Sequence, residues 1–133
     1  MSEAKKWVLY LEDEIELAEE VIIELEYNGF HVVHCASYRE SVLKANMQKF
    51  DIIIADIHLE KGTGDKVIQV IKNNPHHMNF RTPVMILSSN ITKNIISNVG
   101  KDLVAAKVKP YSISELVGSV KTIVFTAREM KAS

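Results

Sequence analysis

Four short apolar segments, each followed at once by a polar side chain, restrict the folds open to this chain of 133 residues. The segments and the residues that follow them are Trp7–Leu11 with Glu12 and Asp13, Ile52–Ala55 with Asp56, Val84–Leu87 with Ser88, and Val104–Val108 with Lys109. Runs this short and this aliphatic are typical of parallel strands buried on both faces. In an open parallel sheet, the ligand site lies beyond the carboxyl ends of the strands. We therefore expect three acids, a hydroxyl and a lysine to converge on one edge of a sheet.

Helix signals stand between the predicted strands. Three pairs of residues have the spacing of a capping box, which marks a helix N-terminus. They are Asp13 with Glu16, Ser37 with Glu40, and Ser112 with Glu115. In addition to the four strands above, we expect one strand over Phe30–Cys35, a surface loop over 76–82 and a further helix over 91–99. Because strand–helix–strand crossovers are right-handed and cover both faces of a sheet, this alternation predicts an α/β fold, a three-layer αβα sandwich around a five-stranded parallel sheet.

Composition narrows the class of function. Sixteen basic and 17 acidic residues give a formal net charge of −1, which favours neither nucleic acid nor an anionic membrane as a partner. A single cysteine, Cys35, excludes an internal disulfide framework and fits a reducing compartment. No apolar stretch approaches the roughly 18 residues of a membrane span. We therefore expect one domain over residues 1–133, with its core at about 6–128, no output domain, and a cytoplasmic location.

The predicted cluster of polar residues has the equipment for phosphoryl chemistry. A carboxylate such as Asp56 can act as a nucleophile and form an aspartyl-phosphate. The surrounding acids would repel a phosphoryl group, and Mg²⁺ is the usual remedy because it binds carboxylate, phosphate and water oxygens. Asp13 and Asp56 could supply direct oxygens, while the longer Glu12 would act through a water. The Lys109 ammonium and the Ser88 hydroxyl could each contact a further phosphoryl oxygen.

This joint pattern resembles the receiver domain of two-component response regulators, over about residues 6–128. The matching elements are the Glu12-Asp13 pair after an apolar strand, Asp56 with Gly64 eight residues on, Leu87-Ser88-Ser89 after Pro83, and Lys109-Pro110-Tyr111 before the last helix. The resemblance implies a flavodoxin-like fold with strand order 2-1-3-4-5. It also implies the role of each site residue. Asp56 would be the phosphoacceptor, Ser88 the switch hydroxyl and Lys109 a contact to the phosphoryl group, with Mg²⁺ on Glu12, Asp13, Asp56 and the backbone carbonyl of His58.

The same resemblance implies a signalling switch rather than an enzyme, one that catalyses only its own phosphoryl uptake and slow loss. A histidine kinase or a histidine phosphotransfer protein would be the donor. A downstream protein would bind the face made by the fourth helix, fifth strand and fifth helix, with no direct contact to nucleic acid or membrane. Several positions depart from the family pattern, and one of them is the small Gly-Ala pair of the fifth strand, which is Leu103-Val104 here. Leu59-Glu60 stand where Met-Pro is usual, and Ala106 replaces the aromatic residue that usually senses the switch hydroxyl.

Three other functions fit these residues less well. A receiver-like adaptor that is never phosphorylated is disfavoured by the completeness of the site, and phosphorylation by a small phosphodonor with Mg²⁺ would discriminate the two. A haloacid-dehalogenase-like phosphatase would carry an Asp-x-Asp motif on its first strand, whereas here the corresponding Asp56-Ile57-His58 is on the third. A flavodoxin would need a phosphate-cradling loop after the first strand, where Glu12-Asp13-Glu14 would instead repel a phosphate.

Overall fold

A five-stranded parallel sheet in the order β2-β1-β3-β6-β7 forms the centre of the molecule. The computed structural model describes residues 5–59, 62–90, 93, 96–97 and 102–132. The strands of the sheet are β1 (Lys6–Leu11), β2 (Phe30–Cys35), β3 (Ile52–Asp56), β6 (Val84–Ser88) and β7 (Leu103–Val108). A separate antiparallel hairpin, β4 (His58–Leu59) with β5 (Gly62–Thr63), follows β3. With the hairpin set aside, the sheet has the predicted order 2-1-3-4-5, and the flavodoxin-like fold is confirmed.

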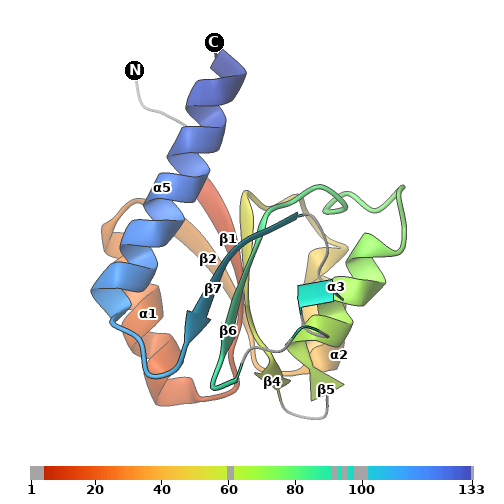
Figure 1. Cartoon of the computed structure of the whole chain (residues 1–133), viewed down its shortest axis with the longest axis horizontal. Helices are drawn as coiled ribbons and strands as arrows, with labels where there is room; N and C mark the ends of the chain where they lie inside the picture. Colours follow the sequence, from red (N-terminus) through yellow and green to blue (C-terminus); the bar gives the residue numbers. More distant parts are fainter. Residues whose placement is uncertain (1–4, 60–61, 91–92, 94–95, 98–101, 133) are drawn as a thin grey trace.

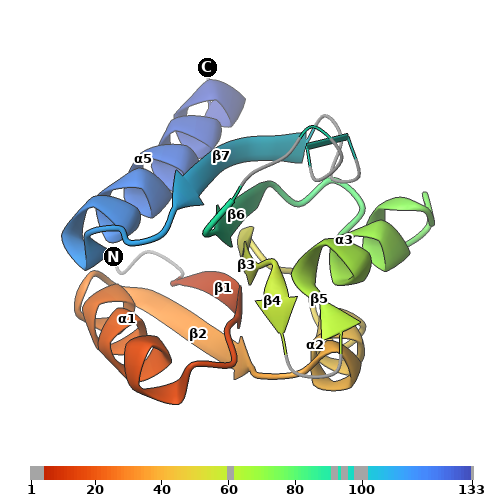
Figure 2. The same ribbon diagram turned by 60° about the horizontal axis from the view of Figure 1, so that its bottom comes forward.

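Helices cover both faces of this sheet (Figure 1). Those described are α1 (Ile15–Tyr27), α2 (Tyr38–Ala45), α3 (Gly64–Lys72) and α5 (Ile113–Ala132). Figure 2 shows α1 and α5 side by side on one face and α2 and α3 on the other. The helix expected over 91–99 falls largely outside the described residues. No helix in the described part of the chain is long and apolar enough to span a membrane.

The side chains of the central strands alternate between two hydrophobic layers. On β1, Val8 and Tyr10 pack with residues of α1 and α5, whereas Leu9 and Leu11 pack on the side of α2 and α3. Strands β3 and β6 are buried along their whole length. This burial on both faces explains why their sequences are unbroken aliphatic runs rather than alternating ones. The carboxyl ends of the same strands are thereby held in fixed positions at one edge.

In two of the three predicted capping boxes, the serine caps the helix as expected. Ser37 Oγ accepts the N–H of Glu40 at 3.2 Å, and Ser112 Oγ accepts the N–H of Glu115 at 3.3 Å. The prediction that Asp13 caps a helix is wrong, because α1 begins one residue later than expected and its N-cap, Glu14, makes no side-chain cap bond.

The carboxylate that reaches the start of α1 is that of Glu12. Its Oε2 accepts the backbone N–H of Glu14 at 3.2 Å. Glu12 is fully buried at the end of β1, and its carboxylate bonds the N–H of the residue that serves as the N-cap of α1. This leaves the exposed Asp13 to the acid cluster.

A buried polar network closes the opposite, amino-terminal end of the sheet. Asn79 is fully buried. Its Oδ1 accepts the N–H of Phe50 at 2.8 Å, and its Nδ2 donates to two backbone carbonyl oxygens of the 45–48 segment at 2.8 and 2.9 Å. Lys72 Nζ donates to three carbonyl oxygens of the 79–82 segment at 2.7 to 3.2 Å and pairs with Asp102 at 3.1 Å.

This network corrects the expectation of a surface loop over 76–82. Both Asn79 and Thr82 are buried, and Thr82 Oγ1 lies 2.9 Å from Asn79 Oδ1. The polar side chains are inside because they bond backbone groups that the strand ends leave without a partner.

The single tryptophan lies at this same amino-terminal end, at the start of β1. The Trp7 ring stacks on the His31 ring, with the centroids 4.4 Å apart and the planes inclined by 27°. The backbone N–H of Trp7 donates to Asp51 Oδ2 at 2.8 Å, which fixes the strand to the turn before β3.

Candidate functional site

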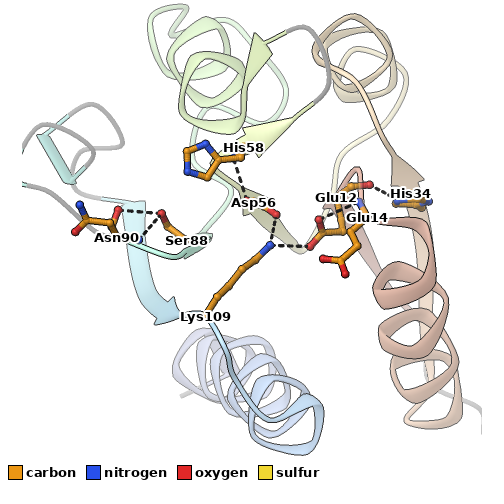
Figure 3. A network of polar contacts seen from close by, with 8 residues as sticks. All are labelled: Glu12, Glu14, His34, Asp56, His58, Ser88, Asn90 and Lys109. Carbon is orange, nitrogen blue, oxygen red and sulfur yellow. Dashed lines mark hydrogen bonds and ion pairs between the residues drawn. The ribbon is translucent and has the colours of Figure 1, made fainter.

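The residues predicted to form a site lie at the carboxyl edge of the sheet, as Figure 3 shows. Glu12 follows β1, Asp56 ends β3, Ser88 ends β6 and Lys109 follows β7. These strands neighbour one another in the sheet, so their parallel register brings the four side chains together from distant parts of the sequence.

Lys109 and Asp56 form the closest contact of the site. Lys109 Nζ lies 2.5 Å from Asp56 Oδ2 and 3.5 Å from Glu12 Oε1. Partial burial by itself lowers the pKa of Lys109, but the hydrogen bond and charge of Asp56, with the charge of Glu12, outweigh it and raise the pKa overall. The ammonium therefore stays charged and partly neutralises two acids.

Glu12 has the most strongly perturbed environment in the cluster. Burial raises the pKa of its carboxyl group to about 8, and the hydrogen bond and charge of neighbouring Asp56 contribute to the rise. The N–H of Glu14 and the charge of Lys109 oppose it. The uncharged form of the Glu12 carboxyl group is therefore favoured.

The donor set fits Mg²⁺. Carboxylate oxygens of Glu12, Asp13 and Asp56 all lie within 4.8 Å of one another. Glu12 Oε1 is buried and has no hydrogen-bond partner among the described residues. Hard oxygen ligands, crowded negative charge and a buried oxygen that accepts no hydrogen bond are what a small divalent cation would satisfy. Asp13 is the solvent-exposed member of the cluster and would bind such an ion from its solvent side.

The loop after Asp56 holds the aspartate from the other side. The N–H of His58 donates to Asp56 Oδ1 at 2.9 Å. The N–H of Gly64, the first residue of α3, donates to the Ile57 carbonyl at 2.8 Å, so the backbone of Gly64 packs directly on this loop. With Oδ1 on His58 and Oδ2 on Lys109, the carboxylate of Asp56 has a fixed orientation.

Ser88 lies on the same edge but does not contact the acids. Its Oγ donates to the Asn90 carbonyl at 2.9 Å and accepts the Asn90 N–H at 3.1 Å. In Figure 3 the hydroxyl group is turned toward Asn90 and away from Asp56. The backbone N–H of Lys109 donates to the Ser88 carbonyl at 2.8 Å, which ties the two strand ends together.

Sequence reasoning missed three residues around Glu12. His34 Nε2 lies 2.7 Å from the Glu12 carbonyl oxygen and must donate to it, since that oxygen can only accept. Tyr10 and Tyr111 have buried hydroxyl groups, and the charge of Glu12 contributes to the raised pKa of each. In the sequence, His34 and Tyr10 are single members of strand segments and give no functional signal. Tyr111 belongs to the Lys109-Pro110-Tyr111 motif, which by itself indicates no role for its hydroxyl group.

The model of the response regulator receiver domain family matches residues 8–130 of this chain. Among curated proteins, the phosphate regulon transcriptional regulatory protein PhoB of Klebsiella pneumoniae is 29% identical over 117 residues, which cover 87% of this chain and 50% of that protein. The chain thus spans about half the length of the curated relatives it matches.

Solved structures of the same fold are numerous. A CheY-like response regulator receiver domain protein of Methanospirillum hungatei JF-1 has a TM-score of 0.82 at 18% identity, covering 96% of this chain and 99% of that one. A response regulator protein of Burkholderia pseudomallei, with a phosphorylated aspartic acid, calcium ion and citrate, has a TM-score of 0.73 at 20% identity, covering 96% and 73%. At these identities the likeness shows a shared fold.

Proposed function

This chain belongs to the response regulator receiver domain family, and we propose that it accepts a phosphoryl group on Asp56 and changes its binding partner in response. The observation that carries the proposal is the placement of Asp56. Its carboxylate is 1% exposed, held by the His58 N–H and by Lys109 Nζ, and flanked by two further acids.

Nucleophilic attack by Asp56 is supported by this geometry. One carboxylate oxygen would bond to phosphorus as the bond from phosphorus to the donor histidine nitrogen breaks, and the electron pair of that bond would stay on the imidazole. The His58 N–H on Oδ1 fixes the orientation of the carboxylate. Lys109 Nζ already contacts Asp56 Oδ2, so it is placed to bind a negatively charged phosphoryl oxygen once the phosphoryl group is attached there.

The acids around Asp56 fit a cation cofactor. Asp13, Asp56 and the His58 carbonyl would hold Mg²⁺, with Glu12 acting through a water, and the ion would offset the negative charge of the incoming phosphoryl group. In the Burkholderia protein of this fold, a phosphorylated aspartic acid and a calcium ion are present together, which is the combination proposed here.

The proposed partners are a sensor histidine kinase or a histidine phosphotransfer protein as donor, and a downstream protein as target. The target would bind the face formed by β7, α5 and the segment over 91–99, most of which lies outside the described residues. Ser88 would transmit the signal by exchanging its bonds to Asn90 for one to the phosphoryl group. The protein would be a switch that catalyses only its own modification.

Phosphorylation by acetyl phosphate tests this proposal. We expect intact-protein mass spectrometry to show one added phosphoryl group on the wild type in the presence of Mg²⁺. The shift should be lost in Asp56→Asn, which keeps the size of the side chain but not its nucleophilic oxygen, and should be suppressed by EDTA. Glu16→Gln, on the exposed first turn of α1, is the matched control and should label as the wild type does. An undiminished shift in Asp56→Asn would assign the acceptor elsewhere.

A further inference from the structure

Three buried oxygen atoms near the acid cluster have no hydrogen-bond partner among the described residues. They are Tyr10 Oη, Tyr111 Oη and Glu12 Oε1. Buried polar atoms in folded proteins are almost always hydrogen-bonded, because an unpaired one loses its hydration without replacement. One such atom could be incidental, but two donors beside one carboxylate acceptor form a complementary set.

The chain places the three groups together. Tyr10 and Glu12 are two residues apart at the end of β1, so their side chains leave the strand on the same side. Tyr111 follows the Lys109-Pro110 turn and packs in the same hydrophobic layer as Tyr10. The Tyr111 phenol is therefore brought under Glu12 by the same loop that presents Lys109 to Asp56.

Electrostatic interactions link the three groups. Burial raises the pKa of both phenols, and the charge of Glu12 raises each further. Glu12 Oε1 is paired with the Lys109 ammonium at 3.5 Å but accepts no hydrogen bond among the described residues, so it can accept one from a hydroxyl group.

We propose that Tyr111 is a positioning residue for Glu12. The Tyr10 hydroxyl donates to Tyr111 Oη, and the Tyr111 hydroxyl donates to Glu12 Oε1, directly or through one enclosed water. A crevice of about 360 Å³ lined by Glu14, Leu17, Lys109, Pro110 and Tyr111 gives a water access to this point. The second oxygen, Oε2, stays on the Glu14 N–H. Both oxygens of Glu12 are thereby held, and its carboxylate keeps the orientation that the cation site requires.

A purely apolar role would not call for hydroxyl groups. Phenylalanine at either position would fill the same volume without a buried O–H. The relevance of Tyr111 to cation binding rests on the proposed function, but the bond between Tyr111 and Glu12 does not, and the experiment separates the two.

A double-mutant cycle in metal-free protein tests the bond itself. Tyr111→Phe, Glu12→Met and the pair are compared by thermal unfolding in EDTA, with Tyr27→Phe as a control because Tyr27 is 85% exposed. We expect Tyr111→Phe to lower the melting temperature when it is made in the wild type but not when it is made in Glu12→Met. The effect of Tyr111→Phe should differ between these two backgrounds by more than about 3 °C. Additive effects would overturn the proposal. Once Tyr111→Phe is in place, the further change Tyr10→Phe should alter the coupling energy with Glu12 by less than Tyr111→Phe did by itself.

A titration with Mg²⁺ then tests the positioning role. The rise of melting temperature with Mg²⁺ concentration reports the affinity. We expect Tyr111→Phe to weaken Mg²⁺ binding by about tenfold and Tyr27→Phe to leave it unchanged. Unchanged affinity in Tyr111→Phe would overturn the positioning role. If the wild type itself bound no Mg²⁺, the proposed cation site would be wrong, while the cycle would still decide the bond between Tyr111 and Glu12.

Discussion

Gly64 lies against the backbone of Asp56: a Cβ atom at position 64 would stand 2.0 Å from the Asp56 carbonyl oxygen. The start of α3 and the end of β3 are therefore in direct main-chain contact, and the glycine that the sequence places eight residues after Asp56 has a steric reason. The candidate nucleophile is fixed by this packing as well as by its polar partners.

We predict that Gly64→Ala destabilises the protein by about 2–3 kcal/mol, because neither backbone can move away without breaking the loop after Asp56. Urea unfolding would measure the loss, and phosphoryl uptake should fall with it. Gly118→Ala in α5 is the matched control. A Cβ there meets nothing within 4 Å, so the change should stabilise the helix by about 0.5–1 kcal/mol. Equal stability of Gly64→Ala and the wild type would contradict the steric argument.

Charge repulsion in the acid cluster predicts the effect of Asp13→Ala. Asp13 makes no helix-cap bond, so its main electrostatic neighbours are the other carboxylates of the cluster. Its removal should raise the melting temperature in EDTA and weaken Mg²⁺ binding. Glu16→Ala, which removes an acid from the first turn of α1 but not from the cluster, should lower the melting temperature instead. A lower melting temperature for Asp13→Ala would show that repulsion is not the dominant effect.

The raised pKa of Glu12 predicts how stability depends on pH. Its folded-state pKa of about 8 exceeds the unfolded value of 4.5, so the folded protein binds the extra proton between these values. The contribution of Glu12 is fully present below about pH 4.5 and is lost as pH rises through about 8. Metal-free protein should therefore lose stability over this window, and Glu12→Gln should flatten the curve. Denaturant unfolding at several pH values would measure it, and an unchanged slope in the variant would assign the proton elsewhere.

The buried network at the amino-terminal end predicts a stability defect without a functional one. Asn79→Ala would leave the Phe50 N–H and two carbonyl oxygens buried without partners, at a cost of about 3–5 kcal/mol. Asn73→Ala, at an exposed position, should be nearly neutral. Below its melting temperature, Asn79→Ala should still label with acetyl phosphate at the wild-type rate. A slower rate in folded Asn79→Ala would mean that the two ends of the sheet are coupled.

The Ser88–Asn90 bonds predict where activation is first visible. If Ser88 Oγ turns toward a phosphoryl group, it must release the Asn90 N–H that it now accepts at 3.1 Å. Hydrogen exchange with and without beryllofluoride and Mg²⁺ should therefore show faster exchange at Asn90, with β7 little changed, because Ala106 has no side-chain torsion with which to respond. A largest change at Ala106 and α5, with Asn90 silent, would be evidence against this route.

The parts of the fold that could be predicted from sequence are those set by local pattern. The strand ends and the Ser37 and Ser112 caps follow from short aliphatic runs and fixed spacings. The meeting of Asp56 and Lys109 follows too, because parallel strands in one sheet end at one edge. Each of these inferences needed only neighbouring residues or a general rule of topology.

The parts that could not be predicted depend on contacts between distant segments. Asp13 has good capping chemistry, but α1 begins at Ile15 with Glu14 as its N-cap, and this one-residue shift of the helix start is not visible in the local spacing. Asn79 looks like a loop residue until the 45–48 segment is packed beside it. In the sequence, nothing distinguishes Tyr10 from the apolar residues of its strand. Its buried hydroxyl group becomes notable only because the fold packs Tyr111, from the far end of the chain, in the same layer.

The position of Trp7 limits which optical signals this protein can give. Glu12 lies five positions after Trp7 along extended strand, a span of about 16 Å at roughly 3.3 Å per residue. The indole is stacked on His31 at the end of the sheet away from the acids. Tryptophan emission should therefore follow unfolding but should not respond to a cation or phosphoryl group at Asp56. Tyr10 and Tyr111 are the native chromophores beside the acids, so ultraviolet difference absorbance in the tyrosine band is the label-free signal of ligand occupancy in this chain.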